Sequence, residues 1–268
     1  MAKTFFIWTI LILILFNLYQ VSFATHNPKT NLSVSFTEPD NIFSELSSSV
    51  EILHISDDDE YLLEWEANAD TLNNVSLLQE FSLLFEDGYL KDASSSWTEE
   101  HDEITITKKT TAEESSRYHL ITFHSAKTDD TFTFDWSEDT LYVLDTPMTD
   151  MHSFKKPKTK DDEKSKKILD AVINQQKDHI KRIIREEANL HQDVLLFPLE
   201  DIAAWKKLTN PDSPSHLPLA KLEDMWGNIY ATLLHVSKNQ PKSKKGMPFL
   251  SWDEKQQKMA LYIHYSHF

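Results

Sequence analysis

The chain has 268 residues, 40% of them hydrophobic and 11% aromatic, and a formal net charge of −16 at pH 7. This length and apolar content predict a packed globular protein of one large domain or two smaller ones, and exclude a disordered chain. The absence of cysteine excludes disulfides, thiolate metal sites and a cysteine nucleophile. Only Gly88, Gly227 and Gly246 are glycine, so the clustered glycines of a phosphate-binding loop or a dinucleotide fingerprint are also lacking.

Residues 1–24 are typical of a targeting segment. Lys3 precedes an apolar run from Phe5 to Phe16, and the small residues Ser22 and Ala24 end the segment. This pattern predicts a secretory signal peptide cut after Ala24. An uncleaved membrane anchor stays open as the alternative, because the apolar run is nearly long enough to span a bilayer. Either way, we expect the rest of the chain outside the cytoplasm.

Charge divides the remainder into two halves. Residues 25–150 carry 28 Asp and Glu against 6 Lys and Arg, a net charge of −22, and residues 151–268 carry a net charge of +5. Phosphate binding needs positive charge, so nucleic acid is not expected as a partner of the first half. The lysine-rich stretch Lys155–Lys160 predicts a linker, and Asp161–Lys167 the first turns of a long helix. We expect these lysines to face the acidic half and the two halves to be docked.

The acidic half is expected to form antiparallel strands around one helix. Val50–Ile55 and Tyr61–Glu66 flank a turn-like aspartate run and predict a hairpin. Apolar residues from Leu77 to Phe85 recur at helical spacing, and Asp87-Gly88 supplies a stop, which predicts a helix on one face of the sheet. Further strands are predicted at Leu32–Phe36, Ile104–Lys108, Tyr118–Phe123, Thr131–Trp136 and Thr140–Leu144, the last two separated by a turn at Ser137-Glu138-Asp139.

The second half is expected to be helix-rich. Apolar residues from Ile168 to Ile184 lie on one helical stripe, with acidic residues before them and basic residues in the later part, as the helix dipole favours. Other elements follow along the chain: a buried strand at Val194–Phe197, a short helix at Leu199–Leu208, a long helix around Leu222–Leu233, and a hairpin of Met247–Trp252 with Lys258–Tyr265.

These elements predict an α+β fold with an acidic N-terminal antiparallel sheet and one packed helix, then a helix-rich domain with a short strand and a C-terminal hairpin. The expected organisation is a signal peptide or membrane anchor at residues 1–24 and an acidic β-rich domain at residues 25–153. A lysine-rich connection at residues 154–167 then leads into a helix-rich α+β domain at residues 168–268.

Histidines and acidic clusters are the residue types that carry metal or acid–base chemistry. His119 and His124 lie on one predicted strand, and their odd separation sends them to opposite faces, so they cannot share a metal ion. His264 and His267 have the same problem on a later strand. The run Asp57–Glu60 resembles a fragment of a calcium loop but lacks its alternate spacing and its glycine, which favours solvated turn carboxylates. No catalytic, metal or cofactor residue is therefore assigned, and the chemical roles of the four histidines stay open.

Motifs for catalysis are also lacking. The chain has no Gly-x-Ser-x-Gly elbow and no HExxH pattern, and its many carboxylates make any chosen pair uninformative. Tryptophans are spread over both halves, and Trp226 falls on the inward stripe of its helix, which indicates a core position.

We therefore expect an exported, non-catalytic cell-envelope protein, secreted or membrane-anchored, that serves as a binding or structural module for an envelope or extracellular partner. The alternative is an extracytoplasmic hydrolase, which requires a deep pocket where carboxylate or histidine side chains converge with shifted pKa values. A third hypothesis places the basic half, near Lys242, Lys244 and Lys245, on an anionic lipid or wall polymer.

Overall fold

The computed structural model describes residues 42–55, 60–128, 132–146, 149–210, 212–213, 216–217, 219–239 and 244–267. Residues Glu38–Phe268 form one compact unit. The predicted signal peptide or anchor, the strand at Leu32–Phe36 and the Asp57–Asp59 run lie outside the described residues. Among the helices described, none is long and apolar enough to cross a membrane.

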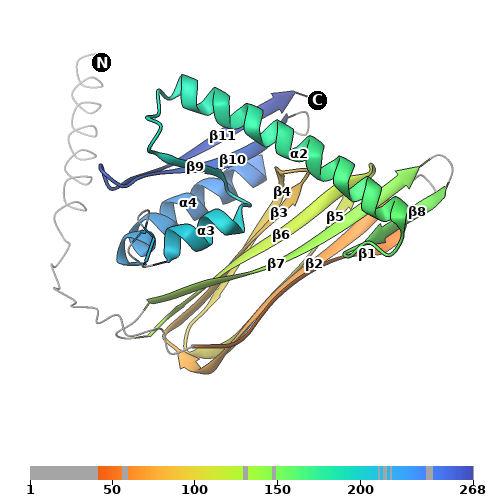
Figure 1. The fold of residues 1–268 in the computed structure, drawn as a ribbon. Coiled ribbons are helices and arrows are strands. Elements are labelled where there is room, and N and C mark those ends of the chain that lie inside the picture. Colours follow the sequence, from red (N-terminus) through yellow and green to blue (C-terminus); the bar gives the residue numbers. More distant parts are fainter. Residues whose placement is uncertain are drawn as a thin grey trace, which may run out of the picture. The chain divides into compact units, whose positions relative to one another are not determined.

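Two antiparallel sheets make up most of the unit (Figure 1). The smaller has the strand order β1-β2-β5, and the larger has the order β11-β10-β4-β3-β6-β7-β8, with β9 paired to β10. The strands are β1 (Phe43–Ile55), β2 (Tyr61–Val75), β3 (Leu77–Glu86), β4 (Tyr89–Thr98), β5 (His101–Ala112), β6 (Ser116–Lys127), β7 (Phe132–Thr146), β8 (Thr149–Phe154), β9 (Leu195–Pro198), β10 (Lys244–Asp253) and β11 (Lys258–His267).

The larger sheet is covered on both faces. Alternate residues of β6 point to opposite sides. Phe123 packs against Trp205 and Trp226 on the helical side, whereas Leu120 belongs to a cluster with Trp65 of the smaller sheet. The helices are α2 (Lys160–Glu187), α3 (Ile202–Thr209) and α4 (Leu219–Asn239).

The predicted fold class is wrong, because the second half is not a helix-rich domain. Strands hold 56% of the described residues and helices 26%. The C-terminal hairpin forms as predicted, from β10 and β11. It also joins the larger sheet, because Gly246 of β10 pairs with Leu90 of β4. Strands from both halves of the chain therefore belong to one sheet.

The predicted helix at Leu77–Phe85 is a strand, β3. It lies between β4 and β6, and from Glu80 to Glu86 every residue is buried. A strand buried on both faces needs apolar residues on both, so the alternation that identifies a half-buried strand disappears. Asp87 and Gly88, with φ of 53° and 88°, form the two-residue turn of the β3–β4 hairpin and do not end a helix.

The predicted turn at Ser137–Asp139 is also wrong, because β7 runs through it without a break. Ser137 and Asp139 are tolerated inside the strand because they bond across to the smaller sheet, and Glu138, on the other face, contacts His119. The hydroxyl oxygens of Ser137 and Ser48 lie 2.6 Å apart, and Asp139 Oδ2 accepts the Val50 N–H at 2.9 Å. Sequence polarity alone did not distinguish this arrangement from a turn.

Two local predictions are confirmed. The predicted hairpin of Val50–Ile55 with Tyr61–Glu66 forms, as part of the longer strands β1 and β2. The long helix after the lysine-rich stretch is α2, which starts with a capping box. Asp162 N–H donates to Thr159 Oγ1 at 3.0 Å, and Asp162 Oδ2 accepts the Thr159 N–H at 3.0 Å.

Candidate functional site

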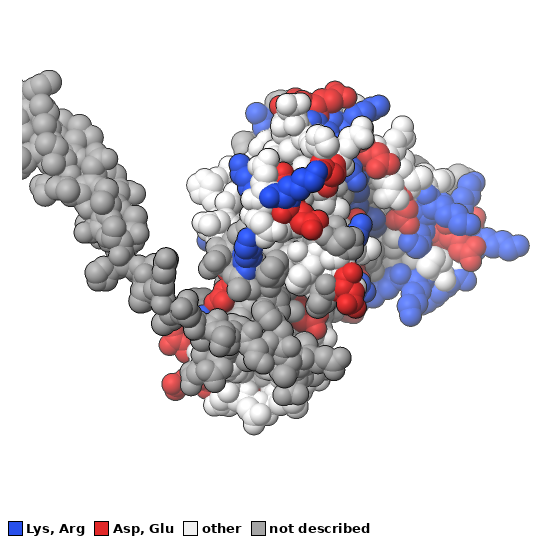
Figure 2. Space-filling view, turned by 60° about the vertical axis from the view of Figure 1, so that its left-hand side comes forward, with Lys and Arg blue, Asp and Glu red and all other residues white. Residues whose placement is uncertain are grey.

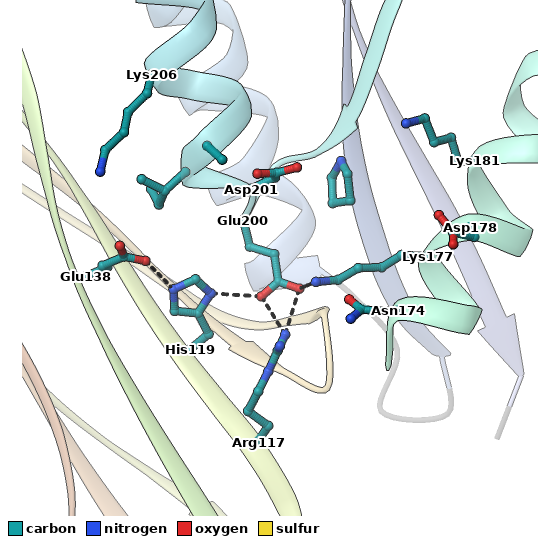
Figure 3. Close-up of a pocket in the computed structure, with 13 residues that line it drawn as sticks. Arg117, His119, Glu138, Asn174, Lys177, Asp178, Lys181, Glu200, Asp201 and Lys206 are labelled. Atoms are coloured by element: carbon teal, nitrogen blue, oxygen red, sulfur yellow. Dashed lines mark hydrogen bonds and ion pairs between the residues drawn. The ribbon is translucent and has the colours of Figure 1, made fainter. Parts of the chain in front are cut away.

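A cavity of about 740 Å³ is lined by residues from β6, β7, α2, the end of β9, α3 and the segment that joins β9 to α3 (Figure 3). Charged side chains dominate its lining, and the only apolar side chains described there are Pro198, Ile202 and Ala203. None of the described lining residues is phenylalanine, tyrosine or tryptophan. The cavity therefore suits polar rather than apolar contents.

Local structure explains why these side chains meet. Arg117 and His119 are two residues apart on β6, so both point to the helical face of the sheet. Pro198 ends β9, and Asp201 caps α3 by accepting the Ala204 N–H at 3.1 Å. Glu200 is thus held in the tight turn between strand and helix.

Glu200 is the centre of the cluster. Its side chain is 2% exposed, and each of its carboxylate oxygens accepts a 3.1 Å hydrogen bond from Arg117 Nη2. Lys177 Nζ of α2 lies 2.5 Å from Oε1, and His119 Nδ1 lies 3.0 Å from Oε2. Burial by itself raises the pKa of Glu200, but the His119 hydrogen bond and the two cationic charges outweigh it, so the pKa falls well below its ordinary value. Glu200 is therefore ionised at neutral pH.

His119 is held between two carboxylates. Its Nε2 lies 3.0 Å from Oε2 of Glu138 on β7, opposite its contact with Glu200. Burial by itself lowers the pKa of His119, but the hydrogen bonds to Glu138 and Glu200 outweigh it and raise the pKa above its ordinary value. The imidazolium form, which donates from both nitrogens, is the form this geometry stabilises.

Gly88 packs directly against the Glu200 cluster. A Cβ at this position would lie 3.1 Å from Glu200 Oε1, 3.1 Å from Met247 Cε and 3.3 Å from Lys177 Cε. The positive φ of 88° and this close approach both favour glycine. The β3–β4 turn therefore leaves just enough room for the Glu200 carboxylate and its partners.

A second buried carboxylate, Glu86, lies on the other side of that turn. It is bound by Lys245 Nζ at 2.6 Å, by Lys91 Nζ at 3.2 Å and by the Tyr118 hydroxyl at 2.9 Å. Burial by itself raises the pKa of Glu86, but the charge of Lys91 and the Lys245 hydrogen bond outweigh it and lower the pKa. Like Glu200, it ties together segments that are distant in the sequence.

The cavity meets the condition set for a hydrolase, since histidine and carboxylate side chains converge there with shifted pKa values. Their contacts, however, leave little for catalysis. Glu200 accepts from three cationic side chains, and both nitrogens of His119 contact carboxylates. No serine, threonine or tyrosine is among the described lining residues. A proton-transfer role would require His119 to give up Glu138 or Glu200, because a general base needs a nitrogen that is not already bound.

The structure separates the histidines that the sequence singled out. His119 lies in the cavity, and His124 lies on the opposite face of β6, beside Glu80 between the two sheets, as the odd spacing predicted. His264 lies on β11, paired in register with Met247. In the part of the chain that the structure describes, no group of three or more His, Asp or Glu side chains is placed to hold a metal ion.

The tryptophans also fall into two classes. Trp205, Trp226 and Trp252 are core residues, as predicted for Trp226, whereas Trp97 is exposed. Of the lysines proposed for an anionic surface, Lys242 lies outside the described residues, and Lys245 is bound to Glu86. The ion pair with Glu86 means that the charge of Lys245 is already matched within the protein.

Sequence analysis missed Arg117, Glu138, Lys177 and Glu200. Nothing in the sequence distinguishes Glu200 from the other acidic residues, and its three partners come from 23 to 83 positions away. Gly88 was the available signal, because a glycine next to Asp in a chain with few glycines is typical of a turn with positive φ or a close approach.

Comparisons with known proteins do not identify a family. No protein-family model matches the chain, and no curated protein matches it. Solved structures with some similarity include a calcium-binding mutant of Bacteroides uniformis beta-glucuronidase 2, at 8% identity over 36% of this chain and 13% of that chain, with a TM-score of 0.27. The CARDB domain of the PF1109 protein from Pyrococcus furiosus, in complex with di-metal ions, is 12% identical over 42% of this chain and 97% of that one, with a TM-score of 0.25. A protein from Archaeoglobus fulgidus is 7% identical over 43% and 100%, with a TM-score of 0.23. Similarity this weak carries no argument, so function must be inferred from the chain's own residues.

Proposed function

We propose that the protein is a non-catalytic binding or structural module that works outside the cytoplasm at the cell envelope. One observation carries this proposal: the ionisable side chains that meet in the cavity already bind one another. A buried carboxylate held by three cationic groups contributes to the fold only while its partners stay in place. The cluster therefore holds β6, α2 and the β9–α3 turn together.

The cavity next to this cluster supplies the binding surface. In Figure 3, Lys206 and Lys181 lie on either side of Glu200, and Asn174 and Asp178 line the α2 wall. Glu138 has a side chain 46% exposed and can reach a ligand from β7. Groups of both signs and an amide fit a small polar ligand that carries donors and acceptors. Export rests on the apolar N-terminal segment, which predicts a location outside the cytoplasm.

A hydrolase is the second candidate, favoured by the Glu138–His119 contact at the cavity wall. If substrate binding drew Glu138 away, His119 Nε2 would be released toward the cavity and could move a proton. The two candidates differ in what His119 does. In a binding module His119 only holds Glu200 in place, and in a hydrolase it transfers a proton during the reaction.

A substrate panel distinguishes them. The chain from Thr25 onward contains the whole compact unit Glu38–Phe268. We expect it to hydrolyse chromogenic esters, phosphate esters and glycosides no faster than its His119→Gln variant does. A rate that His119→Gln abolishes while the variant stays folded by circular dichroism would reverse the order of the two candidates. Mass spectrometry of the N-terminus of protein isolated from its host tests export, with cleavage after Ala24 as the expected result.

A further inference from the structure

The first half of α2 has an outward face that the rest of the protein does not cover. The helix is buried through Ile173, Ile180 and Ile184, which point toward the sheet. Lys160, Lys164 and Lys167 recur at intervals of four and three residues, so they share the opposite face. Figure 2 shows lysine and arginine side chains gathered on one flank of the molecule, with acidic side chains among them.

The lysines between Lys155 and Lys167 outnumber the exposed acidic residues of the same stretch, Asp161 and Glu163. Lys155 pairs with Glu51 and Asp139 of the acidic half, as the sequence predicted, and Lys166 pairs with Asp170. Five others have no acidic partner within 4.0 Å among the residues that the structure describes. They are Lys156, Lys158, Lys160, Lys164 and Lys167. The expectation that the lysines face the acidic half is thus met by Lys155, and these five form no ion pair with that half among the described residues.

Two aliphatic side chains lie among these lysines. Ile168 is 55% exposed and Val172, one turn later, is 48% exposed. Ile168 and Ala171 lie beside Lys160, Lys164 and Lys167, and Val172 lies at the edge of that face. Exposed aliphatic residues flanked by lysines, whose long stems can extend past them, are typical of a helix that lies in a lipid–water interface.

We propose that this face of α2, from Lys160 to Val172, together with Lys156 and Lys158 just before the helix, docks on an anionic phospholipid bilayer. The lysines supply attraction to the headgroups, and Ile168 and Val172 leave water on contact with the acyl boundary. A soluble polyanion would satisfy the lysines but leave the aliphatic pair exposed. The proposal does not depend on any ligand of the Glu200 cavity.

A second copy of the chain is the rival partner, because acidic residues are exposed on β1 and β2. A protruding helix face of this kind would need an acidic groove to enter. The Glu200 cavity has several carboxylates, but its own lysines and arginine match them. A flat anionic surface fits the helix face better than any groove described.

The test is sedimentation of the chain from Thr25 onward with vesicles of phosphatidylcholine, with and without phosphatidylglycerol. This chain lacks the apolar N-terminal segment, which would bind lipid by itself, and contains the whole compact unit. We expect binding only to the anionic vesicles, weakened by salt. The triple variant Lys160→Glu, Lys164→Glu, Lys167→Glu should lose on the order of 100-fold in partition, since each lysine near an anionic surface contributes about 1 kcal/mol.

The control is the triple variant Lys207→Glu, Lys238→Glu, Lys258→Glu, which makes the same charge change at exposed lysines outside the patch. It should keep most of the binding. Ile168→Ser with Val172→Ser should lower the binding that remains at high salt. Equal binding to both kinds of vesicle, no binding by the unchanged chain, or equal losses in the two triple variants would overturn the proposal. So would a patch variant that alters only self-association, which would assign the face to a second copy.

Discussion

His124 Nδ1 and Glu80 Oε1 lie 3.1 Å apart between the two sheets, and neither side chain is exposed to solvent. No hydrogen-bond partner is present for either atom in the described residues, so the contact is a close approach without good bonding geometry. Burial raises the pKa of Glu80 to about 8 and lowers that of His124 to about 4. Both groups are therefore neutral at pH 7, which avoids buried charge at the centre of the sandwich.

This pair predicts an unusual dependence of stability on pH. The pKa of Glu80 is higher in the folded than in the unfolded chain, so its contribution is complete below about pH 4.5 and is lost as the pH rises toward 8. Glu80→Gln removes this loss. We expect the free energy of unfolding of the variant, relative to that of the original chain, to rise by on the order of 2–4 kcal/mol from pH 5 to pH 8. Urea unfolding at the two pH values measures this difference. Glu66→Gln on the exposed face of β2 is the control, and a gap that stays constant with pH would contradict the assignment.

Removing the carboxylate of Glu200 should be costly. Glu200→Gln removes the only counter-charge within 4.0 Å of Lys177 among the described residues and leaves Arg117 with Asp170 alone, at 3.5 Å, which predicts a loss of about 3–5 kcal/mol at pH 7. Because the pKa of Glu200 is lowered in the fold, its contribution is present above pH 4.5 and is lost as the pH falls below that value. Urea unfolding at pH 7 and pH 3.5 should show a smaller gap at the lower pH. Glu186→Gln, at an exposed position late in α2, should change stability by less than about 0.5 kcal/mol.

His119→Gln should show the opposite trend with pH. The pKa of His119 is raised in the folded protein, so its contribution is complete below about pH 6.5 and is lost as the pH rises through the raised value. The variant should therefore be destabilised more at pH 6 than at pH 9. Thermal unfolding at the two pH values measures this, and a loss that is larger at pH 9 would mean that neutral His119 is the form that stabilises the cluster.

Two glycines provide a matched comparison. Gly88→Ala would force a side chain into positive φ and against Glu200 Oε1, which predicts a loss of about 1 kcal/mol or more. Gly227 lies in α4 with nothing within 4 Å of an added Cβ, so Gly227→Ala should stabilise the protein by about 0.5–1 kcal/mol. Chemical unfolding of both variants tests the claim, which fails if the two changes have the same sign.

The local patterns that proved reliable are those in which one face of an element is buried and the other is not. The apolar stripe before Ile184 and the acidic first turn predicted α2. The odd spacing of His119 and His124 placed them on opposite faces of β6. β3 was missed for the same physical reason, because the larger sheet is covered on both faces and its central strand carries no alternation.

The sequence by itself determined the local elements outside the sheet centre, the positions of α2 and the C-terminal hairpin, and the charge difference between the two halves. These depend on contacts between near neighbours and on composition. Only the tertiary structure decided that strands of both halves share a sheet, that Glu200 gathers Arg117, His119 and Lys177, and that the outer lysines of α2 face away from the acidic half. Each of these depends on pairings between distant segments, which composition and periodicity do not encode.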